Sequence, residues 1–520
     1  MVNVVEDYGA ANDASASIVP ILERIYADHG DDTLFYFPAG RYYMDREFEV
    51  TGFNNIGFVG ERAAVAPEGT ADEDEESDDE TPEESSEPDD VYETEEEPEV
   101  EDDDDLPDFC RIDPEFRETG DSDDESDADD GDDEQDGSDD GDSITDDADE
   151  ESEANKTENT VEIVHPDYDG FNGSGHIHRL FRFGKPDDWG RPGRNLRFEG
   201  FDIDWRSPQT GLRVIEADVY DGLVVRNVNV HGRHDSGAFG PLRIAIADPA
   251  GSGLVEGFRV PDGGEFTSDV NTGSTQSIGP IGFLSNDYHQ GTLTYQDCVL
   301  VGFPNNGLYA SNGPGAVRVI GGRYANNNVA QLRLGGRDNY VDGATLVTDT
   351  NMSSEGHEVR QRAIRLESGA ESTVIENVDI DMSDGRASEA ILLRRDVGDV
   401  TFRNLDVHID VDRPINGVRV RGNPNASINP DEFTIEDSTF DHNAAGGSTL
   451  LFDDVGSNAA PALVEDVTID GTMGINGNRP AIFNFRDNVT FRNVTIDQGG
   501  HPQRRGLDNR GDNVTVQNVN

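Results

Sequence analysis

Three neighbouring residues, Arg233, His234 and Asp235, offer the groups that proton-transfer chemistry uses. They follow an alternating apolar segment at residues 222–230, so they stand where a strand ends. A lyase that cleaves a polysaccharide needs a base near the sugar C5 proton, and a cation or an arginine to stabilise the enolate-like intermediate. We therefore take these three residues as candidate catalytic residues. The alternative is that His234 and Asp235 form a hydrogen-bonded pair that anchors a loop.

Four further residues of the same region, Arg243, Asp248, Tyr288 and His289, are candidates for substrate binding. They lie in a stretch, residues 232–291, in which the repeat described below is interrupted. Long excursions from a rigid scaffold are where function is often placed. Arg243 and Asp248 have a structural alternative, an ion pair that holds the excursion down.

Tyr309 is a candidate sugar-stacking residue, with Asn312 and Arg333 beside it. Tyr309 alternates with Leu308, so one of the two side chains faces outward. An outward aromatic ring covers the apolar CH patches of a sugar. The alternative is a surface aromatic residue that the excursion shields.

These residues need elements to hold them, and one short pattern supplies those elements from Asn195 to the C-terminus. Each copy has two runs of alternating apolar residues that meet at Asn or Gly. The clearest copies are residues 195–204, 222–230, 372–381, 399–410 and 488–497. Alternation with a period of two predicts strands rather than helices. Asn and Gly suit the corners because they tolerate left-handed backbone angles.

A third apolar segment lies between the copies and completes the repeat. These segments begin at residues 307, 330, 363, 390, 417, 449, 481 and 506, so successive starts are 23 to 33 residues apart. A period of this length is typical of solenoids. Three short strands per turn predict an all-β fold, a right-handed parallel β-helix. The alternative, a β-sandwich, would need hairpin turns and more even spacing.

The chain divides into three regions. Residues 1–66 form an N-terminal cap and first coil, with a helix expected at Ser15–Tyr26. Residues 67–160 are an acidic, low-complexity insertion, which is expected to be disordered because it contains too few apolar residues to form a core. Residues 161–520 continue the β-helix, with the long excursion at 232–291.

The N-terminal region resembles a known family. Its motifs are DYGA at Asp7–Ala10, then the expected helix, then FPAGRY at Phe37–Tyr42. This order is similar to the N-terminus of the pectate-lyase-like parallel β-helix proteins, which include polygalacturonases, other polysaccharide-cleaving enzymes and viral tail spikes. The resemblance implies that the helix caps the open end of the solenoid. Segments around residues 232–253 and 303–327 also resemble uncharacterised haloarchaeal parallel β-helix repeat proteins.

The family resemblance does not identify a reaction. Polygalacturonases carry motifs of the types NTD, DD, GHG and RIK. This sequence lacks NTD, GHG and RIK, and its DD pairs outside the insertion, at residues 187–188 and 453–454, lack the surrounding pattern. A hydrolase of that kind is disfavoured. Whether the protein is an enzyme stays open. If it is one, a polysaccharide lyase or a glycoside hydrolase fits best.

The net charge of −71 is the strongest compositional feature. Lysine occurs only at Lys156 and Lys185, so nearly all basic residues are arginine. This composition is typical of proteins from a salt-saturated environment, where screening suppresses carboxylate repulsion. We expect folding to need high KCl or NaCl. No cofactor is certain, and Ca²⁺ is the candidate, although the insertion lacks the ligand spacing of a Ca²⁺ loop.

Composition also limits the partners. No basic face favours nucleic acid, and no apolar stretch is long enough to span a membrane. Two cysteines, Cys110 and Cys298, form no disulfide framework, and Cys298 reads as a small buried hydrophobic residue. The sequence shows no signal peptide. The last coil ends without a capping element, which predicts that another subunit or protein covers it.

Three functions fit these observations. The first is an extracellular, halophilic protein that binds or cleaves a surface or environmental polysaccharide. The second is a virion component, such as a tail spike or fibre of a haloarchaeal virus. The third is a structural protein of the cell surface without catalytic activity.

Overall fold

A computed structural model describes residues 1–61, 160–172, 178–184, 191–267, 270, 278–285, 288–311, 313–352, 359–367, 369–422, 431–456, 459–472, 479–497 and 506–520. These residues belong to one compact unit, made from Met1–Ala64 and Ser126–Asn520. Residues 67–159 of the predicted acidic insertion, with Cys110, lie outside the described residues, and so does the candidate Asn312.

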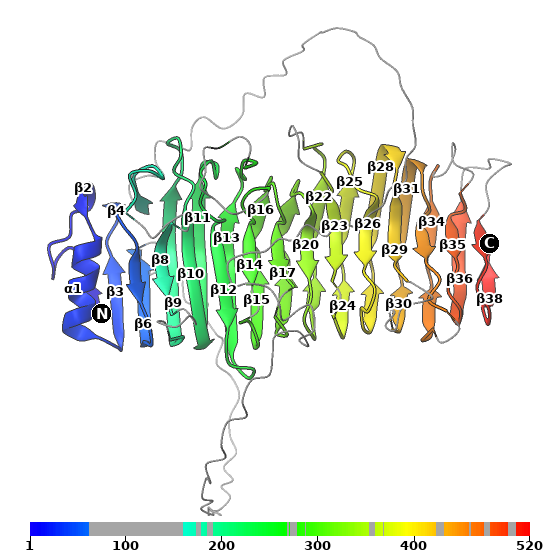
Figure 1. Ribbon diagram of the computed structural model, residues 1–520, viewed down its shortest axis with the longest axis horizontal. Helices are drawn as coiled ribbons and strands as arrows, with labels where there is room; N and C mark the ends of the chain where they lie inside the picture. Colours follow the sequence, from blue (N-terminus) through cyan, green and yellow to red (C-terminus); the bar gives the residue numbers. More distant parts are fainter. Residues whose placement is uncertain are drawn as a thin grey trace, which may run out of the picture. The chain divides into compact units, whose positions relative to one another are not determined.

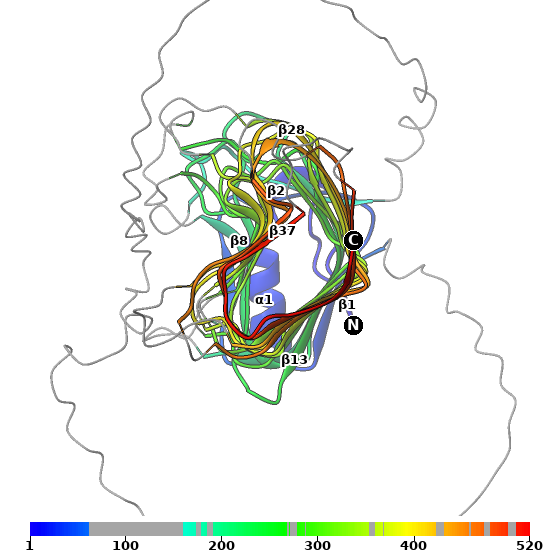
Figure 2. The ribbon, with the colours of Figure 1, turned by 90° about the vertical axis from the view of Figure 1, so that its right-hand side faces the viewer.

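The described strands pair in parallel, and each pairs with the strand one coil further along the chain (Figure 1). Seen along the stack, the coils superpose as one closed loop (Figure 2). The pairing forms three ladders, which correspond to the three apolar segments of the repeat. The predicted all-β fold with parallel strands is therefore confirmed, while its right-handed sense stays a prediction.

Ladder 1 carries the third segment of the repeat. Its strands are β5 (Phe48–Val50), β8 (Arg179–Phe183), β10 (Arg213–Asp221), β12 (Leu242–Ile246), β14 (Phe283–Ser285), β17 (Leu308–Ala310), β20 (Ala330–Leu334), β23 (Arg362–Leu366), β26 (Glu389–Leu393), β29 (Asn416–Val420), β32 (Leu450–Phe452), β35 (Ile482–Asn484) and β37 (Leu507–Asn509).

Ladder 2 carries the first run of each copy. Its strands are β1 (Val2–Asn3), β3 (Thr33–Phe37), β6 (Asn54–Gly60), β9 (Gly193–Asp204), β11 (Leu223–His231), β13 (Ser252–Val260), β15 (Thr292–Gln296), β18 (Ala316–Ile320), β21 (Tyr340–Asp342), β24 (Thr373–Glu376), β27 (Val400–Arg403), β30 (Phe433–Glu436), β33 (Ala462–Glu465), β36 (Val489–Asp497) and β38 (Thr515–Val519).

Ladder 3 carries the second run. It consists of β2 (Asp13–Ser17), β4 (Gly40–Tyr43), β7 (Val161–Val164), β16 (Val299–Val301), β19 (Arg323–Ala325), β22 (Thr345–Thr348), β25 (Asp379–Met382), β28 (Asp406–Pro414), β31 (Thr439–Gly446) and β34 (Thr468–Asp470), with the second halves of β9, β11, β13 and β36.

The corners between ladders 2 and 3 explain why Asn and Gly recur in the sequence. Gly200, Asn227, Asn377, Asn404 and Asn493 join the two runs in the five clearest copies, and their φ angles lie between 51° and 80°. Most side chains avoid this left-handed region, whereas Gly and Asn adopt it. Asn side chains also link coils, since the Asn404 amide donates to Asn377 at 2.7 Å. The predicted corners are confirmed.

Inward-facing apolar residues stack from coil to coil and form the core. In ladder 1, Leu332, Ile364, Ile391, Val418 and Leu450 occupy one register position through five coils, and all are fully buried. Each such side chain contributes about 1.5 to 3 kcal/mol through the removal of apolar surface from water. The stacking therefore fixes the register, because a slip of one residue would turn these side chains outward.

The N-terminal helix α1 (Val19–His29) lies at the N-terminal end of the stack (Figure 1). Its residues Val19, Leu22 and Ile25 are buried in the core. The helix begins four residues later than the sequence predicts, because residues 13–17 pair with β4 as strand β2. Pro20 in the first helical turn marks the start, since its missing N–H has no helical partner to lose there.

The predicted excursion at residues 232–291 needs correction. Strands β12, β13 and β14 lie within it and pair with β10, β11, β15 and β17 as regular members of the ladders. The repeat is hard to see in the sequence because the left-handed residue of β13 is Gly257, with a φ of 61°, and because residues 261–282 separate β13 from β14. Cys298, by contrast, is buried as predicted, and burial raises the pKa of its thiol to about 12.

Candidate functional site

His234, the predicted base, is buried inside the coil. Its Nε2 lies 3.0 Å from the carbonyl oxygen of Phe239, and its ring packs edge-on against Trp205 with centroids 5.0 Å apart. Burial lowers the pKa of His234 to about 4, so the imidazole is neutral near pH 7. With its side chain fully enclosed, His234 has no route to a substrate. It anchors a loop.

Asp235 and Arg233 also hold loops rather than face a common site. The Asp235 carboxylate accepts hydrogen bonds from the backbone N–H groups of residues 209–211, at 2.7 to 3.3 Å. Arg233 donates to the carbonyl oxygen of Gly264 at 2.9 Å and pairs with Glu265 at 3.4 Å. The three predicted catalytic residues therefore point to different partners. These contacts fit the alternative that His234 and Asp235 anchor loops, and the predicted catalytic role gains no support from them.

Arg243 and Asp248 do not pair with each other. Arg243 extends from β12 to Glu216 on β10, at 3.0 Å. Asp248 pairs with Arg194 at 3.2 Å, where the strand β12 has ended. The predicted ion pair between Arg243 and Asp248 is thus wrong, although each of the two residues forms an ion pair with another residue.

His289 is a second buried anchor, with Tyr288 half-buried beside it. The backbone N–H of Ile246 donates to Nδ1 of His289 at 3.3 Å, and Nε2 lies 2.9 Å from the carbonyl oxygen of Ala316. Burial lowers the pKa of His289. This histidine joins the end of β12 to the start of β18, and it is too enclosed for substrate contact.

Tyr309 and Arg333 are the predicted pair that the structure does bring together. They occupy the same register position on β17 and β20. The Arg333 guanidinium carbon lies 4.3 Å from the centroid of the Tyr309 ring. Both side chains lie on the side opposite Leu308, Leu332 and Leu334, which point into the core, but Tyr309 is itself buried, with 9% of its surface exposed.

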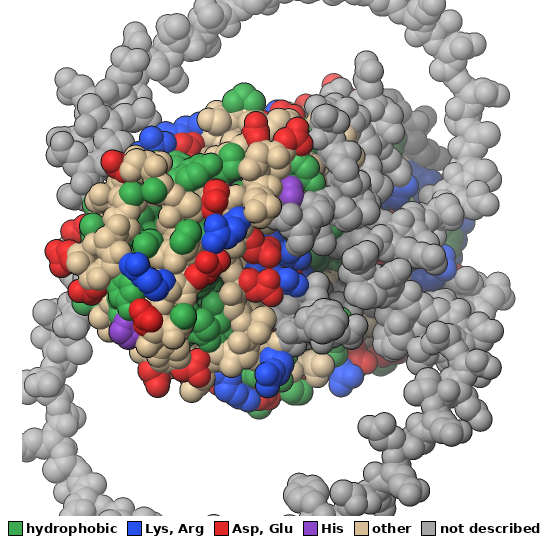
Figure 3. All heavy atoms as spheres, turned by 60° about the vertical axis from the view of Figure 1, so that its left-hand side comes forward, with side chains coloured by type: hydrophobic (Ala, Val, Ile, Leu, Met, Phe, Trp, Pro, Cys, Tyr) green, Lys and Arg blue, Asp and Glu red, His purple; other side chains and the backbone are tan. Residues whose placement is uncertain are grey.

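The same register position continues along all of ladder 1, and we call it the arginine row. Its members, in order, are Glu49, Arg182, Glu216, Arg243, Leu284, Tyr309, Arg333, Arg365, Leu392, Arg419, Leu451, Phe483 and Asp508. Five of its thirteen members are arginine, three are carboxylates, and the other five are apolar or aromatic. On one visible face of the molecule, basic and acidic side chains stand side by side among hydrophobic ones (Figure 3).

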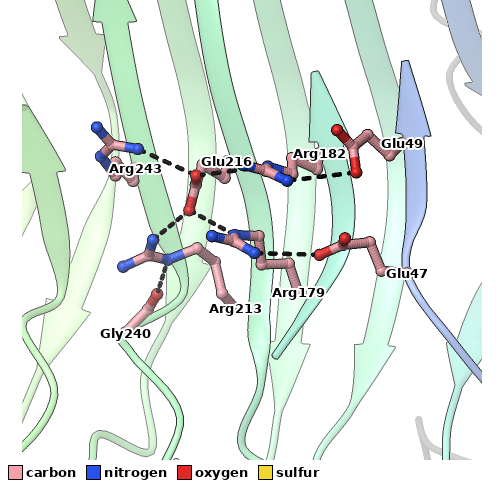
Figure 4. Close-up of polar contacts among 8 residues, drawn as sticks. All are labelled: Glu47, Glu49, Arg179, Arg182, Arg213, Glu216, Gly240 and Arg243. Carbon is pink, nitrogen blue, oxygen red and sulfur yellow. Dashed lines mark hydrogen bonds and ion pairs between the residues drawn. The ribbon is translucent and has the colours of Figure 1, made fainter. Parts of the chain in front are cut away.

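At the N-terminal end of the arginine row, ion pairs gather around Glu216 (Figure 4). Its carboxylate accepts from Arg179 at 2.7 Å, Arg213 at 2.5 Å and Arg243 at 3.0 Å. Arg179 also reaches Glu47 at 3.2 Å. Arg182 lies 3.9 Å from the same carboxylate. We call Glu216 with Arg179, Arg213 and Arg243 the Glu216 cluster.

The ionisation states of the residues in the Glu216 cluster are set by burial and by their ion pairs. Burial raises the pKa of Glu216, but Arg243, Arg213 and Arg179 outweigh it and hold the pKa well below its ordinary value. Burial lowers the pKa of Arg213 to about 10. All four groups are therefore ionised at neutral pH, and the carboxylate cannot serve as a general base near pH 7.

A second group of ion pairs, the Glu367 cluster, surrounds Glu367 at the end of β23. Arg333 pairs with it at 2.7 Å and Arg394 at 3.1 Å, and Arg365 forms a third, short ion pair. Burial opposes ionisation of Glu367, but the charges of the three arginines lower its pKa to about 2. Burial and the neighbouring Arg333 lower the pKa of Arg365 to about 10.

The next coils repeat the arrangement around Glu389. Arg362 pairs with Glu389 at 3.1 Å, and Arg419 bridges Glu389 at 3.2 Å and Asp453 at 3.3 Å. Arginine is suited to such bridges because its planar guanidinium presents several donors in a fixed geometry. Successive coils of ladder 1 are thus connected by arginine and carboxylate side chains outside the core.

Sequence reasoning missed Glu216, Arg365, Glu367 and most of the arginine row. A usable signal existed in the third apolar segments. Aligned by strand register, Tyr309, Arg333, Arg365, Leu392 and Arg419 stand at one outward position of successive segments. Repeated arginine at one outward position of the repeat, in a chain that is otherwise acidic, could have identified this face from the sequence.

Metal binding finds no support in the described ranges, where no group of three or more His, Cys, Asp or Glu side chains is placed to hold an ion. The expectation of Ca²⁺ therefore stays untested. In the same residues, no helix is long and apolar enough to cross a membrane.

Comparison with solved structures finds distant likenesses. The chain is similar to PfbA, a surface adhesin of Streptococcus pneumoniae, at 11% identity over 99% of this chain and 93% of that one, with a TM-score of 0.48. It is similar to the Agl-KA catalytic domain at 13% identity over 99% of this chain and 68% of that one, with a TM-score of 0.45. It is also similar to the mannuronan C-5 epimerase AlgE4 A-module of Azotobacter vinelandii at 13% identity over 99% of both chains, with a TM-score of 0.43.

The chain is a parallel β-helix. This conclusion comes from its own strand pairing, and it confirms the resemblance to pectate-lyase-like proteins at the level of the fold. No protein-family model matches the sequence. No curated protein matches it either. Likenesses this distant support neither a shared activity nor a shared ligand, so the functional argument depends on the arginine row.

Proposed function

We propose that the arginine row binds an anionic polysaccharide that lies along ladder 1. The observation that carries this proposal is the composition of the row. Five of its thirteen residues are arginine, on a chain whose net charge is −71. Guanidinium groups bind carboxylate and sulfate groups through paired hydrogen bonds.

The spacing of the row favours an extended polymer over a small anion. Leu284, Tyr309, Leu392, Leu451 and Phe483 stand between the arginines at the same register position, and each is buried, with 3 to 9% of its surface exposed. They separate the arginines and offer little open surface of their own. Coils follow one another at about 4.8 Å, close to the length of one unit in an extended glycan. A linear chain would therefore meet a new row residue at each step.

The proposal is for binding, because binding is what the arginines of the row can provide. Glu216 and Glu367, two carboxylates with lowered pKa values, are held in ion pairs. His234 is enclosed, so none of these three groups offers the base that a lyase needs. Burial raises the pKa of Glu47 and of Asp453, which pair with Arg179 and Arg419, so the proposal does not extend to cleavage in either direction. The proposal assigns the protein to a surface outside the cell, where such polymers occur.

The test compares two variants that remove one positive charge each. Arg333→Gln changes the row but leaves Glu367 with two arginine partners. Arg403→Gln is the matched control, because Arg403 lies on β27 in ladder 2 and pairs with Glu376 and Glu436. Affinity for polygalacturonate, for a sulfated glycan and for neutral dextran is measured by calorimetry, at a salt concentration that keeps the fold.

We expect the wild type to bind at least one acidic polymer and not dextran. Arg333→Gln should weaken that binding about tenfold, the effect of losing one charge-assisted hydrogen bond. Arg403→Gln should leave it unchanged. Absence of acidic-polymer binding, or equal losses in both variants, would overturn the proposal. Stronger binding of single-stranded DNA than of any glycan would assign the row to nucleic acid.

A further inference from the structure

The arginine row ends in an aromatic cluster that sequence reasoning did not single out. Phe483 on β35 and Phe485 just after it have ring centroids 4.3 Å apart. The Arg510 guanidinium carbon lies 4.6 Å from the Phe483 centroid and 5.2 Å from that of Phe485. Arg479 approaches Phe483 from another turn, at 5.9 Å. We call these four residues the Phe483 platform.

The Phe483 platform repeats an arrangement found earlier in the same row. Arg333 lies over Tyr309 at 4.3 Å in much the same way that Arg510 lies over Phe483. In both places the ring belongs to the row and the arginine comes from the following coil, Arg333 at the row position of β20 and Arg510 directly after β37. Six coil steps separate β17 from β35, or roughly 30 Å at about 4.8 Å per step.

An aromatic ring beneath a guanidinium fixes the plane of the group. The ring face attracts the cation by about 0.5 to 1 kcal/mol at an exposed site, and the N–H groups at the edge stay free to donate sideways. The Arg510 side chain is 53% exposed and pairs with Asp508 at 3.4 Å. Arg479 is exposed as well. Both guanidinium groups are therefore accessible to a carboxylate or sulfate in solution.

We propose that the Phe483 platform is a second anchor for the anionic polysaccharide, so that the protein selects chains long enough to reach from Arg333 to Arg510. This inference depends on the proposed function of the arginine row and adds chain length as its specificity. Two linked anchors bind one polymer more tightly than either alone, because the second contact forms within a complex that already exists. Short oligosaccharides reach only one anchor and miss this gain.

The experiment measures affinity for oligogalacturonates of four and of ten units. Arg510→Gln removes the exposed cation of the platform, and Phe483→Leu removes the ring while keeping an apolar side chain on the row. Arg492→Gln is the control, because Arg492 lies in the same coils on β36, is 43% exposed and pairs with Glu465. Melting temperatures of all variants are recorded to identify any that fold poorly.

We expect the wild type to bind the ten-unit chain at least tenfold more tightly than the four-unit chain. Arg510→Gln and Phe483→Leu should abolish that difference and leave four-unit binding within twofold, while Arg492→Gln changes neither. The second anchor would be overturned if the wild type showed no preference for the ten-unit chain, or if both platform variants kept that preference. The proposed function would then still stand. If neither oligosaccharide nor polymer binds the wild type, both proposals fail together.

Discussion

At the scale of single residues, the described chain encloses arginine side chains that would ordinarily lie at the surface. Arg213, Arg362 and Arg365 are almost enclosed, yet each lies against a carboxylate. Burying a charge is costly unless a partner compensates it. The ion pairs of ladder 1 are therefore sensitive to the loss of either partner, more than the exposed pairs on the other ladders.

Glu367→Gln tests this sensitivity. The substitution leaves Arg333, Arg365 and Arg394 without their shared carboxylate, so we expect the free energy of unfolding to fall by about 3 kcal/mol, as for a broken buried pair. Denaturant unfolding in high salt is the measurement. Glu436→Gln, at a more exposed ion pair of ladder 2, serves as control and should cost much less. Equal losses would show that burial does not decide the effect.

The same carboxylate predicts a pH dependence. The folded protein lowers the pKa of Glu367 from its ordinary value of 4.5 to about 2. Its contribution to stability is therefore fully present above about pH 4.5 and is lost as the pH falls through the folded pKa. Between pH 5 and about pH 2, the free energy of unfolding should fall more steeply with decreasing pH for the wild type than for Glu367→Gln. Parallel curves for the two proteins would contradict this assignment.

At the scale of elements, the coil is defined by its corners. Long strands such as β9, β11 and β36 run through ladders 2 and 3 and bend at Gly200, Asn227 and Asn493. The left-handed residue turns the chain without ending the pairing on either side. Side-chain amides then connect neighbouring corners, as between Asn518 and Asn493 at 2.9 Å. Corner geometry and coil stacking therefore support each other.

Substitutions at Asn404 separate these two contributions. Asn404→Gly keeps the left-handed angle accessible and removes the amide contact with Asn377. Asn404→Ala removes the contact and adds the steric cost of that angle, about 1 to 2 kcal/mol. We expect the alanine variant to unfold at lower denaturant concentration than the glycine variant. Thr401→Ala on the outer face of β27 should have little effect, and equal stability of both Asn404 variants would contradict the corner argument.

At the scale of the whole molecule, charge dominates. A net charge of −71 repels itself strongly in dilute buffer, and salt screens that repulsion. Arginine and carboxylate pairs on ladder 1 offset only a small part of it. The composition therefore predicts that salt concentration affects the stability of the chain as a whole.

Dialysis from molar KCl into dilute buffer should unfold the protein cooperatively. Thermal melts followed by circular dichroism, at a series of KCl concentrations, measure the effect. Betaine at matched osmolality is the control, since a zwitterion adds no screening and should not replace KCl. A melting temperature that stays constant from molar to millimolar salt would refute the prediction.

Much of the local structure of this protein can be predicted from sequence patterns. Alternation and recurring Asn or Gly are local properties, so β3 at Thr33–Phe37 and the corner at Asn404 could be predicted before any contact was known. The beginning of α1 and the strands β12 to β14 were misjudged where pairing with distant strands overrides the local pattern. The candidate site, in contrast, depends on the way in which the coils stack. Glu216 meets Arg179 and Arg243 because coil stacking aligns residues that lie 37 and 27 positions away. The same stacking encloses His234, because burial, unlike strand preference, depends on the coils above and below.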